Sequence, residues 1–572
     1  MKKKFLVLLR SPERFDANNY FLGRWCVPFN YENKNTIKKC LEYHWNNKIK
    51  REEDAKYLNN FYEKVLEKLS IKLNKIHKIN FSKKEWRLIL GFWLTSFITK
   101  CFDSYENLNF FLKENKRKFS INFFLINSNN IIPKDYSDYT INYINNFFFN
   151  QYIYQDLITK HFNNKFIIKE KKIIKNNFGT LNINSFSKNN FFILLIKKFL
   201  GKFSFIQKNI FFEFSYINPL FKKKLMWMLN IMPNYNFPFY DFKKKEILKN
   251  VRQLNLGISS KLKFENFIDQ NILKYVPYSY LENFRNIYND ALKLNLNSTK
   301  IFSTGSYIAN DFFKIWLANR LKKKAKFYIM YHGGGIPVKN HLSNHDEKIS
   351  HKVITWHKPV NNKQIQLLNL SLKNKIIRRK KIYILITLEP GYFYPVRFFS
   401  GGPVSSQFLI DYEEKKIFAK KVIEQGQKIK IRSLSNNEWD LKNRVRKDLG
   451  ANCYDNIAKF RDSLKNTKLH ISGCFSTTFS ESITMNIPSI GFFDKKKQNY
   501  NNKFNYLIKL FYENSLLFHN TKNLMQFLKN NEFNLDEWWN SKKIQKIIDI
   551  YKKDILSTKN KSFNKWKKLI NK

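Results

Sequence analysis

The sequence predicts an α/β fold in which two doubly wound, Rossmann-like lobes face a cleft, with extra helices in the N-terminal half. Three observations predict this. Strand-like and helix-like segments alternate from about residue 299, the alternation pauses at a basic connector near 373–381, and it then restarts. Strands joined through helices form right-handed parallel units, so each run predicts one parallel sheet. The 572 residues are also too many for one typical core.

The first lobe is expected within residues 1–365. A long apolar segment at 81–112 has helical spacing and predicts one or two buried helices. Further on, "KIFSTG" predicts a strand that ends in a turn, and "SYIANDFFKIWLANRLKKKA" an amphipathic helix. "KFYIMYHGGG" predicts a strand ending in three glycines, and "KVITWH" another strand. "MKKKFLVLLRSPERF" predicts a first buried strand, because its apolar run is too short for a signal peptide.

The second lobe is expected at 378–535, followed by a helical tail at 536–572, so that the lobes meet near 355–380. "KIYILITLE", "KIKIRSL" and "KLHISGC" predict strands, whereas "SQFLIDYEEKKIFAKKVIEQ" and "YDNIAKFRDSLKNT" predict helices. In such sheets ligands bind beyond the carboxyl ends of the strands. The loops that follow these strands are therefore the first place to look for a site.

Composition narrows the class of protein. The net charge of +58 taken alone suggests a polyanionic partner. However, Lys, Asn, Ile and Phe are raised together and the lysines are spread evenly, which an AT-rich coding bias explains. We therefore expect no nucleic-acid partner, while a basic face on an anionic membrane stays open. The sequence has five cysteines, and none of them has CxxC spacing, so neither disulfides nor a zinc site is expected. This cysteine usage favours a reducing compartment. No apolar run is long enough to span a membrane.

The stretch "LHISGCFSTTFSESITMNIPSIGFFD" carries four hydroxyl residues and a carboxylate between two apolar runs. Its strand–loop–helix pattern places Ser476, Thr477 and Thr478 at a helix amino end, where backbone N–H groups and the helix dipole favour an anion. Glu481, one turn further, could accept hydrogen bonds from sugar hydroxyls. The alternative is a capping box, in which Thr478 caps the helix and Glu481 reaches back.

A second candidate constellation lies in "MYHGGGIPVKNHLSNHDEKISHKVITWHKP". Its triple glycine, Gly333, Gly334 and Gly335, allows a positive φ and a close backbone approach, either as a simple turn or as a cleft loop. His332 would then be a general base or a phosphate ligand. Asp346 is the carboxylate we select as catalytic, although such residues are often solvated charges. The five histidines match no common zinc spacing, so no metal or cofactor is expected.

Two further stretches of the sequence could carry a site. Arg432 ends an expected strand, where an arginine could bind an anion or be an ordinary surface charge. "YFLGRWCVPF" brings together Arg24, Trp25 and Cys26. A core tryptophan beside a surface arginine is the interpretation we favour there, because the sequence offers Cys26 no partner as a nucleophile.

Several stretches together resemble a family of transferases from bacterial surface-polysaccharide gene clusters, in order over about residues 20–550: "YFLGRWC", "EWRLILGFWLTSFI", "IFSTGSYIANDFFKIWLANR", "MYHGGG", "ITWHKP", "KIRSL", "STTFSESITMNIPSIGFFD" and "DEWWNSKKIQ". The family is similar to the two-lobed GT-B glycosyltransferases. The resemblance implies that Ser476, Thr477, Thr478 and Glu481 lie on the donor side and that the residues from His332 to Gly335 line the facing lobe. The sequence departs from the family pattern around "TW", where His357 and Lys358 replace Gly-Trp.

The resulting hypothesis is a cytoplasmic glycosyltransferase, either free or peripheral on the inner membrane. It would move a sugar from a nucleotide diphosphate sugar or a CMP-sugar to a surface glycan acceptor, without a bound metal. The alternatives are a nucleic-acid-binding protein, which requires clustered basic and aromatic residues, and a non-catalytic scaffold for polysaccharide assembly.

Overall fold

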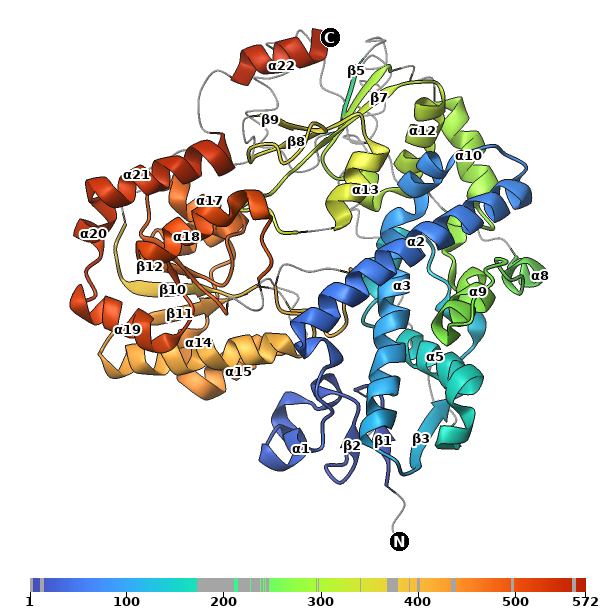
Figure 1. Cartoon of the computed structure of the whole chain (residues 1–572), viewed down its shortest axis with the longest axis horizontal. Helices are drawn as coiled ribbons and strands as arrows, with labels where there is room; N and C mark the ends of the chain where they lie inside the picture. Colours follow the sequence, from blue (N-terminus) through green and yellow to red (C-terminus); the bar gives the residue numbers. More distant parts are fainter. Residues whose placement is uncertain are drawn as a thin grey trace, which may run out of the picture.

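The computed structural model describes residues 4–10, 15–171, 210–213, 227, 237, 240, 242, 246–294, 296, 298–339, 341–367, 379–389, 391–398, 402–433, 439–494, 498–557 and 562–571. Two five-stranded parallel sheets form the centres of two lobes, which lie side by side with a helical N-terminal region below the first (Figure 1). This confirms the predicted α/β class with two lobes built on parallel sheets. The connector between the lobes falls mostly outside the described residues.

The first sheet has the order β5-β6-β7-β8-β9. Its strands are β5 (Ile210–Glu213), β6 (Lys300–Ser303), β7 (Lys326–Met330), β8 (Lys352–Thr355) and β9 (Gln364–Gln366). Alternate side chains of β7 enter different cores, because successive residues of a strand point to opposite faces. Phe327 and Ile329 join the main core, which also holds helix α12 (Asp311–Lys322). Tyr328 and Met330 pack with the C-terminal helix α22 (Ser562–Asn571).

The second sheet has the order β11-β10-β12-β13-β14, so the strand order reverses between β10 and β12. Its strands are β10 (Tyr383–Thr387), β11 (Ile429–Arg432), β12 (Thr467–Ser472), β13 (Ser489–Phe492) and β14 (Leu517–Phe518). Such a reversal opens a crevice at the carboxyl ends of the two strands, where ligands of doubly wound folds bind. The described strands of the first sheet instead follow one another in chain order.

Helices surround the second sheet: α14 (Gln407–Glu424), α15 (Leu441–Leu449), α16 (Phe460–Leu464), α17 (Thr477–Thr484), α18 (Asn505–Glu513), α19 (Thr521–Asn530), α20 (Asp536–Asn540) and α21 (Lys542–Tyr551). Of these, α17, α18 and α21 share one apolar cluster. The expected tail at 536–572 therefore divides: α20 and α21 belong with the second lobe, and α22 returns to the first (Figure 1).

Two long antiparallel helices dominate the N-terminal half, α2 (Lys48–His77) and α3 (Lys83–Glu114). The apolar segment at 81–112 thus forms a single helix, whose first turn is fixed by a capping box between Ser82 and Glu85. The expected first strand is present as β1 (Leu6–Val7). It pairs with β2 (Tyr20–Phe21) and lies beside the pair of β3 (Phe119–Phe124) and β4 (Phe166–Lys171).

The remaining helices of this half are α1 (Lys34–Lys38), α4 (Tyr136–Asp138), α5 (Phe147–Leu157), α8 (Lys249–Arg252), α9 (Lys263–Tyr275), α10 (Phe284–Lys293), α11 (Ser306–Ala309) and α13 (His341–Ile349). The single helix expected at 306–325 is wrong. Asn310 interrupts it, because its side chain accepts the N–H of Phe313 and so begins α12. No described helix is long and apolar enough to cross a membrane.

Candidate functional site

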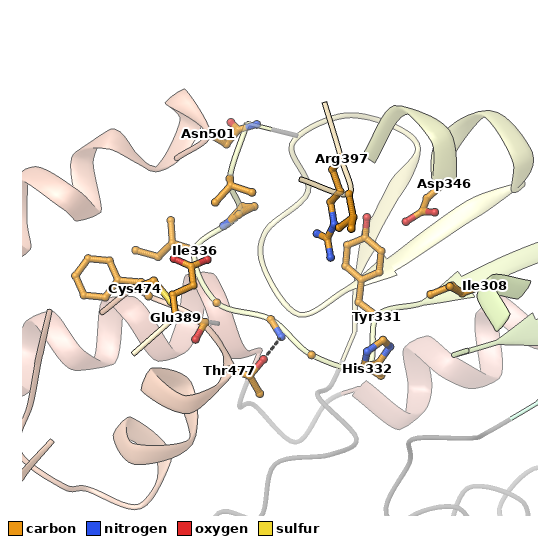
Figure 2. Close-up of a pocket in the computed structure, with 18 of the residues that line it drawn as sticks. Ile308, Tyr331, His332, Ile336, Asp346, Glu389, Arg397, Cys474, Thr477 and Asn501 are labelled. Atoms are coloured by element: carbon orange, nitrogen blue, oxygen red, sulfur yellow. Dashed lines mark hydrogen bonds between the residues drawn. The ribbon is translucent and has the colours of Figure 1, made fainter. Parts of the chain in front are cut away.

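A cavity of about 650 Å³ lies between the lobes, at the carboxyl ends of both sheets (Figure 2). The first lobe contributes the loop after β7, helix α13 and several aromatic side chains. The second lobe contributes the loops after β10 and β12. Of the residues selected from the sequence, the cavity is lined by His332, Gly333, Gly334, Gly335, Asp346, Ser476 and Thr477. The two candidate loops, about 140 residues apart in the chain, therefore meet at one site.

The triple glycine permits close contact between the lobes. A Cβ atom on Gly335 would lie 1.9 Å from the carbonyl oxygen of Phe475 and 2.9 Å from Cα of Ser476. The same carbonyl accepts the N–H of Ile336 at 3.0 Å. The φ of Gly335 lies outside the left-handed region. Close approach, rather than a positive φ, is therefore what requires glycine here.

Hydroxyl groups of α17 complete this contact, which we call the interlobe latch (residues 334–336 with 475–480). The Thr477 hydroxyl accepts the N–H of Gly334 at 3.0 Å (Figure 2). The Ser480 hydroxyl donates to the Gly334 carbonyl at 3.1 Å and lies 2.8 Å from the Tyr551 hydroxyl. The Thr477 hydroxyl, which was expected to hold a phosphate, is thus used in a hydrogen bond between the two lobes.

The latch extends into a short antiparallel bridge between Val338 and Tyr500. On either side of the bridge, the N–H of Lys339 donates to Asn499 and the N–H of Asn501 to Pro337, both at 2.7 Å. Backbone hydrogen bonds therefore close one wall of the cavity.

The expected capping box at Thr478 and Glu481 is wrong. Helix α17 begins at Thr477, so Ser476 is the N-cap, and its side chain makes no capping hydrogen bond. The Glu481 carboxylate instead accepts from Arg461 of α16 at 3.0 Å. Glu481 and Thr478 lie on α17 of the second lobe but do not line the cavity. The physical reason is that Arg461 holds the carboxylate away from the site.

His332 is exposed in the cavity and is held by its ring nitrogen Nδ1, which lies 3.1 Å from the Thr304 carbonyl oxygen. A carbonyl can only accept, so Nδ1 carries the proton and Nε2 of the neutral ring carries the lone pair. Thr304 is itself fixed, because its N–H donates to the buried carboxylate of Glu213 at 3.1 Å. This chain of contacts sets the orientation of the His332 ring.

Asp346 enters the cavity from α13 and is 8% exposed. Among the described residues, its Oδ1 atom has no hydrogen-bond partner. Burial raises the pKa of this carboxyl to about 7; a hydrogen bond from Tyr331 and the charge of Arg397 oppose the shift, and Glu347 adds to it. A carboxyl with this pKa can take up or release a proton near neutral pH.

The second lobe also contributes a carboxyl group to the cavity, that of Glu389, which was not among the residues expected from the sequence. It follows β10 and lines the cavity beside the loop after β12 (Figure 2). Although the side chain is partly exposed to the cavity, loss of water raises its pKa to about 7, and Gln498, which donates to Oε2 at 3.1 Å, opposes this. The signal was available, since "TLEP" stands at the carboxyl end of a strand.

Arg397 is the arginine that the cavity contains, in place of the expected Arg432. The Arg397 side chain is exposed in the cavity, and no hydrogen bond or ion pair to it is found within the described part of the chain. Arg432 does end β11, as expected, but β11 is an edge strand. Its guanidinium donates to Asp455 and Ser463, both at 2.7 Å, and so lies outside the cavity.

The other sequence candidates are structural. Burial lowers the pKa of His357 to about 4 and of His345 to about 3, so both rings stay neutral. Trp25 is a core residue, and burial raises the pKa of the Cys26 thiol, so it is no nucleophile. In the described part of the chain, no group of three metal-type ligands forms around the 332–357 histidines.

Comparison with known families assigns the class. The model of the LIC12162 family of transferases matches residues 4–570. The chain belongs to this family. It is therefore a transferase, as the resemblance in the sequence implied, and its two parallel-sheet lobes around one cavity are the arrangement of a GT-B fold.

Matches among solved structures include a variant of the wall teichoic acid polymerase TagF. It shares 11% identity over 67% of this chain and 94% of its own, with a TM-score of 0.32. The same variant soaked with CDPG is 12% identical over the same shares, also with a TM-score of 0.32. An O-GlcNAc transferase mutant of Thermobaculum terrenum is 8% identical over 55% of this chain and 58% of its own, with a TM-score of 0.27. No curated protein matches the chain.

Proposed function

We propose that this transferase moves a sugar from a nucleotide-activated donor, a nucleotide diphosphate sugar or a CMP-sugar, to a cell-surface glycan acceptor. The observation that carries the proposal is the cavity at the reversal point of the second sheet. There Arg397, which has no hydrogen-bond or ion-pair partner among the described residues, lies with two carboxyls whose pKa burial raises to about 7. The reaction would take place in the cytoplasm, and the chain's net charge of +58 would favour binding to an anionic membrane surface.

The donor's phosphate would lie in the second lobe. Arg397 supplies a full positive charge, and α17 presents its uncapped amino end beside Ser476. A charged donor hydrogen bond to a leaving phosphate contributes most when water is excluded, because the negative charge grows as the bond to the sugar breaks. Arg397 therefore replaces Arg432 as the proposed donor-phosphate ligand.

The acceptor would enter from the first lobe. The acceptor hydroxyl attacks the anomeric carbon, the bond from that carbon to the phosphate oxygen breaks, and the hydroxyl proton passes to Asp346. The Asp346 carboxylate is buried in the cavity wall, and its Oδ1 atom has no hydrogen-bond partner among the described residues, as a base awaiting a hydroxyl would. His332 lines the same wall and would position the acceptor, or take the proton itself through Nε2.

The test is a thermal-shift screen against nucleotide sugars and CMP-sugars, followed by titration calorimetry with the donor that stabilises the protein. At 100 times its dissociation constant, a donor raises the free energy of unfolding by about 2.7 kcal/mol. Arg397→Ala should weaken donor binding at least 10-fold. Arg446→Ala is the matched control, since Arg446 is exposed in the same lobe away from the cavity.

Asp346→Asn separates the two halves of the proposal. It should keep donor affinity within twofold and lower turnover by roughly 10²-fold or more, because the variant lacks the proton acceptor. If no nucleotide sugar gives a thermal shift or a heat of binding, the donor assignment fails and a non-catalytic assembly role takes its place.

A further inference from the structure

Outside the cavity, three potential metal ligands come together where a short 3-10 helix at His44–Asn46, which precedes α2, packs against α2 and α3. His44, Asp54 and Glu106 each place one ligand-type atom within 4.8 Å of the other two. An imidazole nitrogen with two carboxylate oxygens is a donor set that zinc and similar divalent ions accept. In a tetrahedral zinc site, ligand atoms stand about 3.4 Å apart, which small side-chain rotations reach from this arrangement.

The imidazole of His44 is buried, at 4% exposure, and within the described part of the chain only one of its nitrogens has a hydrogen-bond partner. Nε2 lies 2.9 Å from Oδ1 of Asp103, a carboxylate, so Nε2 carries the proton and donates it. Nδ1 then holds the lone pair, and it has no hydrogen-bond partner among the described residues. A histidine that donates one nitrogen to a carboxylate and offers the other is the arrangement that metal-binding histidines adopt.

A cation already stands in this cluster. The Lys50 ammonium lies 2.6 Å from Asp54 Oδ2 and 2.7 Å from Glu106 Oε2. Its side chain is 35% exposed, whereas those of the two acids are 15% and 18% exposed. The lysine can therefore turn out to solvent while the carboxylates keep their places. It neutralises only one of two negative charges, and it makes no hydrogen bond to Nδ1 of His44 in the described part of the chain.

We propose that His44, Asp54 and Glu106 bind a divalent transition-metal ion of the zinc type, with Lys50 occupying the site when no ion is bound. The two carboxylates balance the ion's charge, and a water completes four ligands. These three residues do not line the cavity between the lobes. Next to His44, the Trp45 carbonyl accepts from Gln407 of the second lobe at 2.8 Å, so the ion would brace α2 and α3 against that lobe.

Removing the competing lysine is the direct test. Lys50→Met should bind one Zn²⁺ per chain in titration calorimetry, at least 10-fold more tightly than the wild type, and Zn²⁺ should raise its melting temperature. Lys83→Met is the matched control, because Lys83 also lies between two carboxylates, Glu63 and Glu67, at 3.3 Å each. No metal-type group with a histidine forms there in the described part of the chain, so Zn²⁺ should not stabilise that variant.

The ligands are checked in the Lys50→Met background. Adding Glu106→Gln should weaken Zn²⁺ binding at least 10-fold, and Asp103→Asn should weaken it roughly 10- to 100-fold by releasing the imidazole. If Lys50→Met is unstable alone, recovery of its melting temperature on adding Zn²⁺ supports the site equally well. Equal Zn²⁺ affinity in Lys50→Met, Lys83→Met and the wild type would overturn the proposal and leave a simple ion-pair network.

Discussion

Gly335→Ala tests whether the interlobe latch depends on the close approach of two backbones. The new Cβ would lie 1.9 Å from the Phe475 carbonyl oxygen, which belongs to the backbone and cannot rotate aside. Cβ atoms essentially never come closer than 3.0 Å to such an atom. The two loops must therefore move apart by about 1 Å, because van der Waals repulsion rises steeply at shorter distances.

The size of the effect follows from the hydrogen bonds that such a shift breaks. The bond from Ile336 to Phe475 and the bond from Gly334 to Thr477 are both 3.0 Å long, and about 1 Å more takes them beyond hydrogen-bonding range. Each contributes about 0.5–1.5 kcal/mol, so the latch loses about 1–3 kcal/mol. Since every 1.4 kcal/mol is a factor of ten, the closed arrangement becomes about 5- to 150-fold less favoured.

The assay compares donor affinity with unfolding in urea for three proteins: the wild type, Gly335→Ala and Gly334→Ala. The last is the control from the same loop, since its Cβ would meet only the Trp356 ring, at 3.3 Å. We expect Gly335→Ala to weaken donor binding 5-fold or more while Gly334→Ala stays within about twofold. Wild-type affinity and wild-type unfolding in Gly335→Ala would show that the lobes do not need this contact.

Three further predictions concern the cavity. Asp346 has a folded-state pKa of about 7, above the ordinary value of 3.8, so its contribution to stability is complete below pH 4 and is lost as the pH rises to 7. Asp346→Asn should therefore gain stability relative to the wild type between pH 4 and pH 8 in urea titrations; an unchanged difference would contradict the raised pKa. Ser476→Ala should weaken donor binding by about 0.5–3 kcal/mol with little effect on stability, whereas Thr477→Ala should also lose about 1 kcal/mol of stability through the latch. Calorimetry of both variants checks this, and wild-type donor binding in both would end the phosphate-loop assignment. His332→Ala should lower turnover roughly 10²-fold without lowering the melting temperature; the reverse pattern would make His332 a packing residue.

Sequence reasoning predicted the framework of both lobes because buried parallel strands leave continuous apolar runs. The same apolar runs also indicated where the cavity lies. The loops after β7 and β12 follow the carboxyl ends of strands, which is where ligands bind in such sheets. Helix α13 was missed because "HLSNHDEKI" carries too few apolar residues to show helical spacing. Consequently Asp346 was selected without any indication of the element that buries it.

The partners that charged side chains find through tertiary contacts could not be predicted from the sequence. Arg432 and Glu481 stand at the expected ends of their elements, yet Asp455 and Arg461 take up their charges. Nothing in the local pattern distinguishes a charge that meets a ligand from one that meets a neighbouring helix. Glu389 was different, because the rule that selected Ser476, a position after the carboxyl end of a strand, applies equally to Glu389 after β10 and was not used there.

The return of α22 to the first lobe bears on how far the lobes can move. Trp566 and Ile570 pack on Phe212 and Phe302, over the face of the first sheet opposite α12. The polypeptide therefore passes between the lobes twice, once before residue 379 and once after residue 557. Any separation of the lobes must therefore leave both connections intact. Cutting the chain after α21 would remove one of them and would also strip an aromatic cover from the first sheet.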